Sequence, residues 1–155
     1  MVGRIAFQGE LGAYSHQACQ QSRPRMEAVP STTFEEVVDK VARGEVDLGM
    51  LAVENSTYGR VADVHSLLPK SGLHIVDEAF VRVHVNLLGV PGAKLDEVRE
   101  AHGHVVILPQ CAGFLKAHAI RGRVSSDNAR AAREVAEAGD KSKAALASEL
   151  AASIY

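Results

Sequence analysis

The chain is poor in aromatic residues and lacks an excess of positive charge. It has no tryptophan, three tyrosines and four phenylalanines among 155 residues. Lysine and arginine number 17 against 19 acidic residues, for a net charge of −2. Stacking on bases is therefore disfavoured, and neither a nucleic acid nor an anionic membrane is an expected partner.

Long hydrophobic runs are also missing from the sequence. No apolar stretch approaches the roughly 20 residues that a membrane-spanning helix needs. The first residues, MVGRIAFQGE, show neither the hydrophobic region nor the cleavage pattern of a signal peptide. We therefore expect a cytoplasmic protein without membrane contacts.

Cysteine is scarce, with only Cys19 and Cys111 far apart in the sequence. In a cytoplasmic protein such a pair is expected to stay reduced, because disulfides form mainly in oxidising compartments. We expect two buried thiols, although a structural disulfide is an alternative.

What the chain does contain is the composition of an ordinary globular protein, 46% hydrophobic and 23% charged. Its length suits one domain or two small lobes. Apolar strand-like runs alternate with helical patterns, which predicts an α/β fold with mainly parallel sheets. The expected strands are residues 4–7, 26–30, 47–54, 104–108, 121–126 and 143–148, and the expected helices are 15–22, 31–45, 61–68, 94–101, 111–118, 127–138 and 149 onward.

Two stretches carry most of this interpretation. In the helix expected over 31–45, Phe34, Val37, Val38 and Val41 share one face, and Gly44 supplies a C-terminal cap. The continuous apolar run 47–54 predicts a strand covered on both faces.

The long β-rich stretch Leu73–Val90 interrupts the alternation of strands and helices. We interpret it as the crossing between two α/β lobes, with residues 1–76 in the first lobe and 77–155 in the second. The last helix reaches Tyr155 without a cap or a following strand. We therefore expect a chain cut short before a strand that returns to the first lobe.

Three polar loops follow expected strands, where ligands bind in open α/β sheets. Their side chains, backbone N–H groups and helix dipoles suit carboxylates and hydroxyls. The candidate residues are Gly9, Gly12 and Ser15 in QGELGAYS, Asn55, Ser56, Thr57 and Gly59 in ENSTYG, and Gln110 and Cys111 in HVVILPQC.

Each of the first two loops also has a purely structural interpretation. A Gly-x-x-Gly loop with a serine is a common strand-to-helix turn. It lacks the G-x-G-x-x-G and P-loop spacings, so a dinucleotide is not expected. ENSTYG is equally compatible with a helix cap and a turn, because Asn and Ser satisfy free N–H groups locally.

A metal site and a nucleophile are weaker hypotheses. His102 and His104 form an H-x-H pair, but no third ligand lies at a suitable spacing, so we expect no metal. His118 lies on a helix face with Phe114 and is expected to pack. Cys111 could be a thiol nucleophile at a helix start, but it also begins an apolar stripe, and a core role is favoured.

Taken together, the loops resemble the catalytic domain of prephenate dehydratases. The matching segments are GELGAYS, ENSTYGRV, which fits an E-N-S-x-x-G-x-V pattern, GHVVILPQC, and the run that begins DNARAAREV. The resemblance extends over essentially all 155 residues.

The resemblance implies a two-lobe fold like that of type II periplasmic binding proteins, with the active site in an inter-lobe cleft. It implies the decarboxylating dehydration of prephenate to phenylpyruvate, a carbon–oxygen lyase reaction of L-phenylalanine biosynthesis. It implies no cofactor and a homodimer or higher homo-oligomer.

The same resemblance implies roles for individual residues. Asn55, Gln110 and His104 would be catalytic, with His104 in a positioning role rather than a proton-transfer role. Neutral donors of this kind can hold a dicarboxylate. The residues expected to bind substrate are Ser15, Ser56, Gly59 and Gly12.

The chain departs from the family pattern at several points. Gly103 replaces a serine before the histidine, and Pro109 removes a backbone donor before Gln110. The Thr-Arg-Phe motif, which would supply the acid for the leaving hydroxyl and an arginine for carboxylate, does not occur, nor does a regulatory ACT-type domain. We therefore expect little or no dehydratase activity from these 155 residues alone.

Three alternatives remain open. The chain could be a binding module for small carboxylates on the same fold, a relative that uses arogenate, or an inactive relative marked by Gly103.

Overall fold

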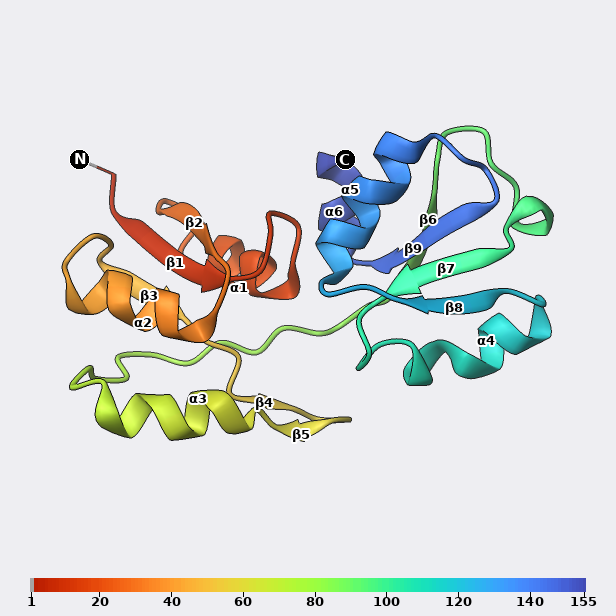
Figure 1. Cartoon of the computed structure of the whole chain (residues 1–155). Coiled ribbons are helices and arrows are strands. Elements are labelled where there is room, and N and C mark those ends of the chain that lie inside the picture. The colour runs from red at the N-terminus through yellow and green to blue at the C-terminus, as the bar shows by residue number, and fades with distance from the viewer. Residues whose placement is uncertain (1) are drawn as a thin grey trace. The chain divides into compact units, whose positions relative to one another are not determined.

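A computed structural model describes residues 2–155, which fall into two compact units (Figure 1). The first unit holds the residues up to Glu10 and Tyr14–Arg82, and the second holds Leu11–Ala13 and Val83–Tyr155. The division therefore lies six residues beyond the expected boundary after residue 76. One cause is the ion pair of Arg23 with Asp77, at 2.6 Å, which ties the extended segment to the first unit.

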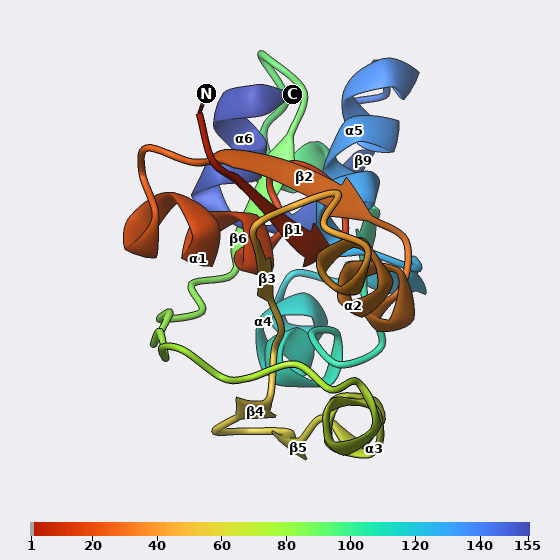
Figure 2. The same cartoon turned by 90° about the vertical axis from the view of Figure 1, so that its left-hand side faces the viewer.

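The first unit is built on a parallel sheet with strand order β2-β1-β3. Two helices connect the strands, and because the chain reverses direction across the sheet, right-handed connections place them on opposite faces (Figure 2). The elements are β1 Arg4–Gln8, α1 Tyr14–Ser22, β2 Glu27–Ser31, α2 Phe34–Ala42 and β3 Leu48–Met50.

Strand β1 is the centre of the first core. Ala6 packs with Val37 of α2, and both are fully buried. The next residue, Phe7, is also fully buried and stacks on His16 of α1, with ring centroids 5.2 Å apart. The alternation of faces along β1 thus fills both sides of the sheet.

Helix α2 confirms the clearest helical pattern in the sequence. Thr33 caps its start, because the Thr33 hydroxyl accepts a hydrogen bond from the Glu36 N–H at 3.1 Å. The chain leaves the helix through Gly44, whose φ of +70° is in the left-handed region.

The strand expected over 47–54 is wrong in length and in burial. Within the run 47–54, only β3 belongs to the parallel sheet, and its residues are half-buried or exposed. The chain then forms the hairpin β4 Glu54–Asn55 and β5 Gly59–Arg60, followed by α3 Ala62–Leu67 and the short 3-10 helix η1 Leu68–Lys70.

The second unit contains a mixed sheet of order β6-β9-β7-β8, in which only the β6–β9 pair is antiparallel. Both units therefore confirm an α/β class with mainly parallel strands. The strands are β6 Asn86–Gly89, β7 Glu100–Gly103, β8 Arg121–Val124 and β9 Lys143–Ala147, and the helices are α4 Ala112–Ala117, α5 Asn128–Ala138 and α6 Glu149–Ile154, with 3-10 turns η2 Leu95–Glu97 and η3 Pro109–Cys111.

Strand β9 organises the core of this unit. On one face Leu146 packs with Leu115 of α4, and on the other face Ala145 packs with Ala132 of α5 and Ala151 of α6. Figure 1 shows α4 on one side of the sheet and α5 and α6 on the other.

The sequence was misinterpreted between residues 73 and 108. The expected helix 94–101 is only the turn η2, and β7 begins at Glu100 rather than 104. Residues 104–108 form a turn that buries Ile107, since an apolar run can line a core without being extended. In the stretch Leu73–Val90, only β6 is a strand.

Residues Leu11–Ala13 join the second unit through its last helix. The buried Ser148 hydroxyl donates to the Gly12 carbonyl at 2.5 Å and accepts from the Ala151 N–H at 3.0 Å, and the Tyr155 hydroxyl donates to the Leu11 carbonyl at 2.9 Å. Gly12 has a φ of +93°, and a Cβ there would lie 2.8 Å from the Ala151 Cα. Only glycine fits this backbone.

Among residues 2–155, no helix is both long enough and apolar enough to cross a bilayer.

Replacing Gly12 with alanine should lower the free energy of unfolding by about 2–4 kcal/mol, because a left-handed backbone and an overpacked contact both oppose the methyl group. Gly92→Ala is the matched control in the same unit. Its φ is +79°, but the nearest atom to a new Cβ is the flexible end of Lys141 at 3.8 Å. Gly92→Ala should lower the free energy of unfolding by only about 1 kcal/mol. Urea unfolding of both variants measures the difference, and equal losses would contradict the close contact.

Candidate functional site

The first candidate loop follows β1, as expected, and leads into α1. Ser15 is the second residue of that helix and is half-buried. Gly12 is buried, and its carbonyl oxygen already accepts the Ser148 hydrogen bond. The close packing against Ala151 is enough to explain a glycine at position 12, and no ligand is needed. Of Gly12 and Ser15, only Ser15 has a side chain that could bind a ligand.

The second loop is the turn of the β4–β5 hairpin, not the start of a helix. The Asn55 side-chain oxygen accepts hydrogen bonds from the backbone N–H groups of Thr57 and Tyr58, both at 2.9 Å. Gly59 pairs with Asn55 across the hairpin and has a φ of +92°. Helix α3 instead starts at Ala62, and its N-cap residue Val61 gives no side-chain cap. Of the structural alternative, the turn is therefore correct for the Asn55 oxygen, and the helix cap is wrong.

The turn uses only one end of the Asn55 amide. Its Oδ1 is an acceptor for two N–H groups, whereas its NH₂ group can only donate. Ser56 beside it is exposed, as is Tyr58. The hairpin thus fixes the direction of a neutral donor next to an exposed hydroxyl.

The third loop begins at His104, directly after β7. The His104 backbone N–H donates to the Asn128 side-chain oxygen at 2.7 Å, and its ring Nδ1 accepts from the Val106 N–H at 3.3 Å. In the neutral ring the proton therefore lies on Nε2, which becomes a donor. Gln110 is exposed, and its NH₂ group donates to the Val106 carbonyl at 2.8 Å, which leaves its oxygen and its second N–H hydrogen for a ligand.

These residues divide between the two units. Ser15, Asn55, Ser56 and Gly59 belong to the first, whereas Gly12, His104 and Gln110 belong to the second. Sequence reasoning missed Asn128, which holds His104, and Ser148, which holds Gly12. Both stand at the start of a helix, where polar residues are usually interpreted only as caps.

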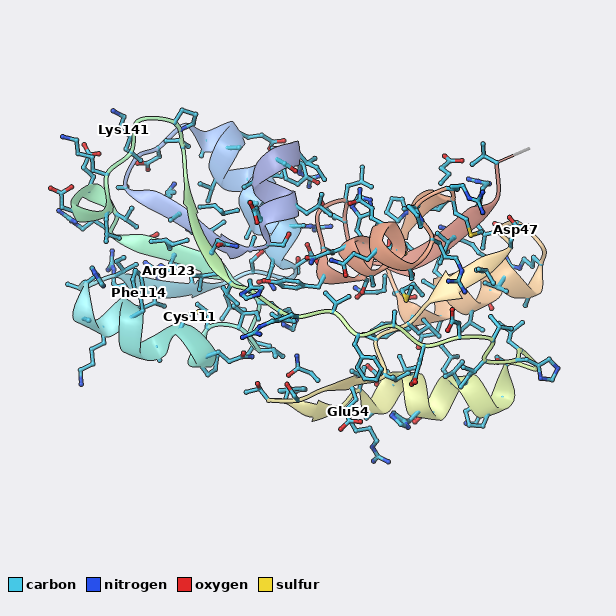
Figure 3. The ribbon with its side chains drawn as sticks, turned by 180° about the vertical axis from the view of Figure 1, so that it is seen from behind. Asp47, Glu54, Cys111, Phe114, Arg123 and Lys141 are labelled. Carbon is cyan, nitrogen blue, oxygen red and sulfur yellow. The ribbon has the colours of Figure 1, made fainter. Side chains whose placement is uncertain are left out.

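The structure supports a packing role for Cys111, which Figure 3 shows with Phe114 along the segment that leads into and forms α4, whereas Phe114 is exposed. Cys111 packs against the core around Leu115, and burial raises the pKa of its thiol. A raised pKa disfavours the thiolate that a nucleophile needs. The ring centroids of His118 and Phe114 lie 4.3 Å apart and the His118 Nδ1 contacts the Phe114 carbonyl oxygen, but both residues are exposed, so the expected packing of His118 is only this local contact.

Both cysteines are free thiols, as expected, but only Cys19 is fully buried.

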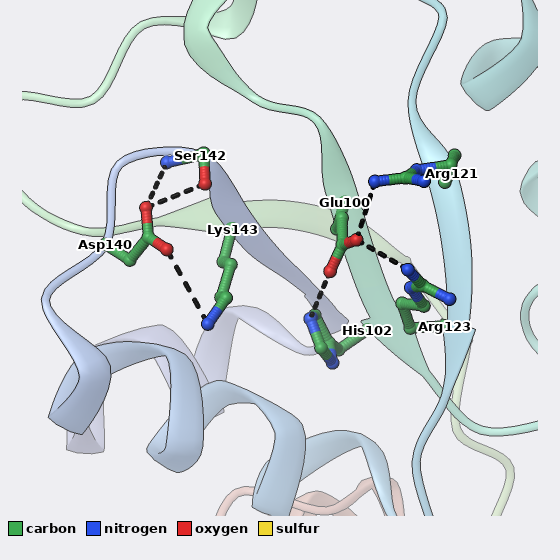
Figure 4. Close-up of polar contacts among 7 residues, drawn as sticks. All are labelled: Glu100, His102, Arg121, Arg123, Asp140, Ser142 and Lys143. Carbon is green, nitrogen blue, oxygen red and sulfur yellow. Dashed lines mark hydrogen bonds and ion pairs between the residues drawn. The ribbon is translucent and has the colours of Figure 1, made fainter.

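A charged cluster lies on one face of β7 and β8 (Figure 4). One Glu100 oxygen accepts from Arg121 at 3.0 Å and from Arg123 at 2.7 Å, and the other lies 3.8 Å from the His102 Nε2. The hydrogen bond from Arg123 lowers the pKa of Glu100. Both guanidinium groups are exposed, so these pairs contribute little to stability.

Within residues 2–155, no group of three or more histidine, cysteine, aspartate or glutamate side chains is arranged to hold a metal ion. Two open hollows in the second unit, of about 500 and 130 Å³, are lined by other residues than the candidates, among them Leu95, Asp96, His118 and Lys94.

Comparison with known proteins gives a family match along almost the whole chain. The family model described as prephenate dehydratase matches residues 5–155. A protein of Komagataeibacter europaeus named bifunctional N-acyl-homoserine lactone acylase/prephenate dehydratase is 46% identical over 150 residues, which are 97% of this chain and 53% of that protein.

A second relative is the arogenate dehydratase/prephenate dehydratase 1 of Arabidopsis thaliana chloroplasts. It is 38% identical over 152 residues, which cover 98% of this chain and 39% of the relative. The chain therefore spans about half or less of these two curated relatives. A crystal structure of prephenate dehydratase from Arthrobacter aurescens in complex with L-Phe superposes with a TM-score of 0.89 over 98% of this chain and 52% of that chain. At 24% identity, it supports the fold alone.

Cys19 should resist alkylation in the folded protein. It is 1% exposed, and burial raises the pKa of its thiol to about 12. We expect iodoacetamide at pH 8 to label Cys111 slowly and Cys19 only after unfolding in urea, as measured by mass spectrometry. Because the folded pKa is raised, the stabilising effect of the neutral thiol is present below the unfolded pKa of about 8.5 and is lost as the pH rises toward 12. Rapid labelling of Cys19 at pH 8 without denaturant would contradict its burial.

Gly103→Ser restores the expected serine at a crowded position. A Cβ at Gly103 would lie 3.1 Å from the Leu146 Cβ, an atom fixed to the neighbouring strand β9. We expect a loss of about 1–3 kcal/mol in the free energy of unfolding. Gly113→Ser is the control, since nothing lies within 4 Å of a Cβ on that exposed helix residue. The control should be neutral or slightly stabilising, and thermal unfolding compares the two variants.

Proposed function

This chain belongs to the prephenate dehydratase family, and from that membership we propose that it binds prephenate and forms the catalytic part of an enzyme that converts it to phenylpyruvate. The observation that carries the proposal is the family match over residues 5–155. It is supported by the candidate loops, which present neutral hydrogen-bond donors.

The reaction itself requires binding and one proton rather than redox chemistry. The bond between the ring and its carboxylate breaks and releases carbon dioxide, and its electron pair completes the aromatic ring. The ring C–O bond breaks at the same time, and the departing hydroxyl takes up one proton and leaves as water. Aromatisation drives the reaction, so the protein has to hold two carboxylates and supply that proton.

We assign the holding of the substrate to the neutral donors. The Asn55 NH₂ group and the His104 Nε2–H would each donate to a carboxylate, and Gln110 would donate the second hydrogen of the NH₂ group that binds the Val106 carbonyl. Such donors stabilise an anion without a buried positive charge of their own. The Ser15 and Ser56 hydroxyls would add donors, and Gly59 would keep the hairpin clear of the substrate.

The finer architecture follows from the same proposal. We propose that the two units are the lobes of a fold like that of the periplasmic binding proteins, that no cofactor takes part, and that the protein is a cytoplasmic homo-oligomer. Size-exclusion chromatography with light scattering tests the last of these, since a monomer at all concentrations would rule it out.

A relative named for two substrates supports a second candidate substrate. The Arabidopsis relative carries arogenate in its name, and arogenate differs from prephenate by an amino group in place of the side-chain ketone. The Komagataeibacter relative adds an N-acyl-homoserine lactone to the compounds worth testing. Calorimetric titration of the chain with prephenate, arogenate and an N-acyl-homoserine lactone ranks the three. Tight binding of an unrelated small carboxylate, without prephenate binding, would favour a binding module.

Asn55→Asp is the sharpest test of the proposed site. Aspartate keeps the oxygen that accepts from Thr57 and Tyr58, so the hairpin should stay folded. It replaces the donating NH₂ group with a charged oxygen that repels a dicarboxylate. We expect prephenate binding to weaken by at least tenfold with little change in melting temperature, measured by calorimetry and circular dichroism.

Two further variants serve as controls for the effect of Asn55→Asp on prephenate binding. Gln21→Glu adds the same charge on an exposed part of α1 and should leave prephenate binding unchanged. Asn55→Ala removes both ends of the amide and should lose binding together with hairpin order. If Asn55→Asp binds prephenate as tightly as the unaltered chain, Asn55 is not a ligand.

A further inference from the structure

We propose that Asn128 is a positioning residue, which sets the direction of the His104 imidazole toward the substrate. The inference rests on the proposed function, because it concerns how one candidate ligand is held. It starts from a contact across 24 residues of sequence, in which the Asn128 side-chain oxygen accepts the His104 backbone N–H at 2.7 Å.

This contact is not explained by helix capping. Asp127 is the N-cap of α5, and its carboxylate accepts from the Arg130 N–H at 2.8 Å. Asn128 is the next residue and lies within the helix, with its side chain turned to the end of β7 instead. The cap and the loop contact are therefore made by two different side chains, which can be removed one at a time.

The loop after β7 has little freedom once Asn128 binds it. Gly103, the last residue of the strand, is buried, and a Cβ there would lie 3.1 Å from Leu146 and 3.5 Å from the Asn128 oxygen. The chain must leave the strand between these two side chains. The hydrogen bond to the His104 N–H then fixes the peptide plane from which the imidazole projects.

The imidazole is fixed in turn by the following residues. The His104 Nδ1 accepts from the Val106 N–H at 3.3 Å, and the Gln110 amide donates to the Val106 carbonyl at 2.8 Å. Asn128 thus holds the first residue of a short network that contains two of the candidate ligands. Without it, the His104 backbone can rotate, and the Nδ1 contact that selects the Nε2–H form of the ring is weakened.

The test compares variants that differ in one feature each. Asn128→Ala removes the acceptor, whereas Asn128→Asp keeps it and should leave the ring shifts of His104 unchanged, although its added charge should weaken prephenate binding. Asp127→Ala removes the helix cap and should lower the melting temperature without altering His104. Asn128→Ser, which shortens the side chain but keeps a polar helix start, replaces Asn128→Ala should that variant fail to fold.

The readouts are the ¹⁵N chemical shifts of the His104 ring, which report the tautomer, and the affinity for prephenate. We expect Asn128→Ala to shift the ring from the Nε2–H form toward a mixture and to bind prephenate about tenfold more weakly. Unchanged ring shifts in Asn128→Ala, or changed shifts with unchanged affinity, would overturn the assignment. If the unaltered chain does not bind prephenate or arogenate, the proposed function fails, and the ring shifts still show whether Asn128 positions His104.

Discussion

One buried hydroxyl links the beginning of this chain to its end. The Ser148 oxygen caps α6 through the Ala151 N–H and donates its proton to the Gly12 carbonyl. A buried polar atom left without these bonds would be costly, so the loss of either bond would destabilise the fold. Through this atom, a loop that follows the first strand is packed as part of the second unit, although the residues on both sides of the loop belong to the first.

In two of the candidate ligands, Asn55 and His104, the accepting half of the side chain holds its own loop. The Asn55 oxygen binds the hairpin turn, and the His104 Nδ1 binds the residue two positions later. What remains for a ligand is the donating half of each group. A side chain that is both fixed and neutral loses little entropy on binding an anion and needs no counter-charge in the free protein.

The sequence predicted those parts of the fold that depend on local pattern. Helix α2 was found from its apolar face and cap, and β9 from its run of small apolar residues. The region 94–108 was misplaced, because Val105 to Leu108 fit a buried turn as well as a strand. Candidate residues were found by type and loop position. The contact of Asn128 with His104 could not be found, because a tertiary hydrogen bond between distant residues leaves no periodic signal.

Strand β9 has a consequence for how this chain can vary. Three of its four fully enclosed residues are alanines, at positions 144, 145 and 147. Truncating an alanine removes a single methyl group, worth roughly 0.8 kcal/mol, whereas enlarging it forces apart a helix and a sheet in contact. The centre of the second unit therefore tolerates loss of volume far better than gain. Sequence drift at these three positions should therefore be confined to the small residues glycine, alanine and serine.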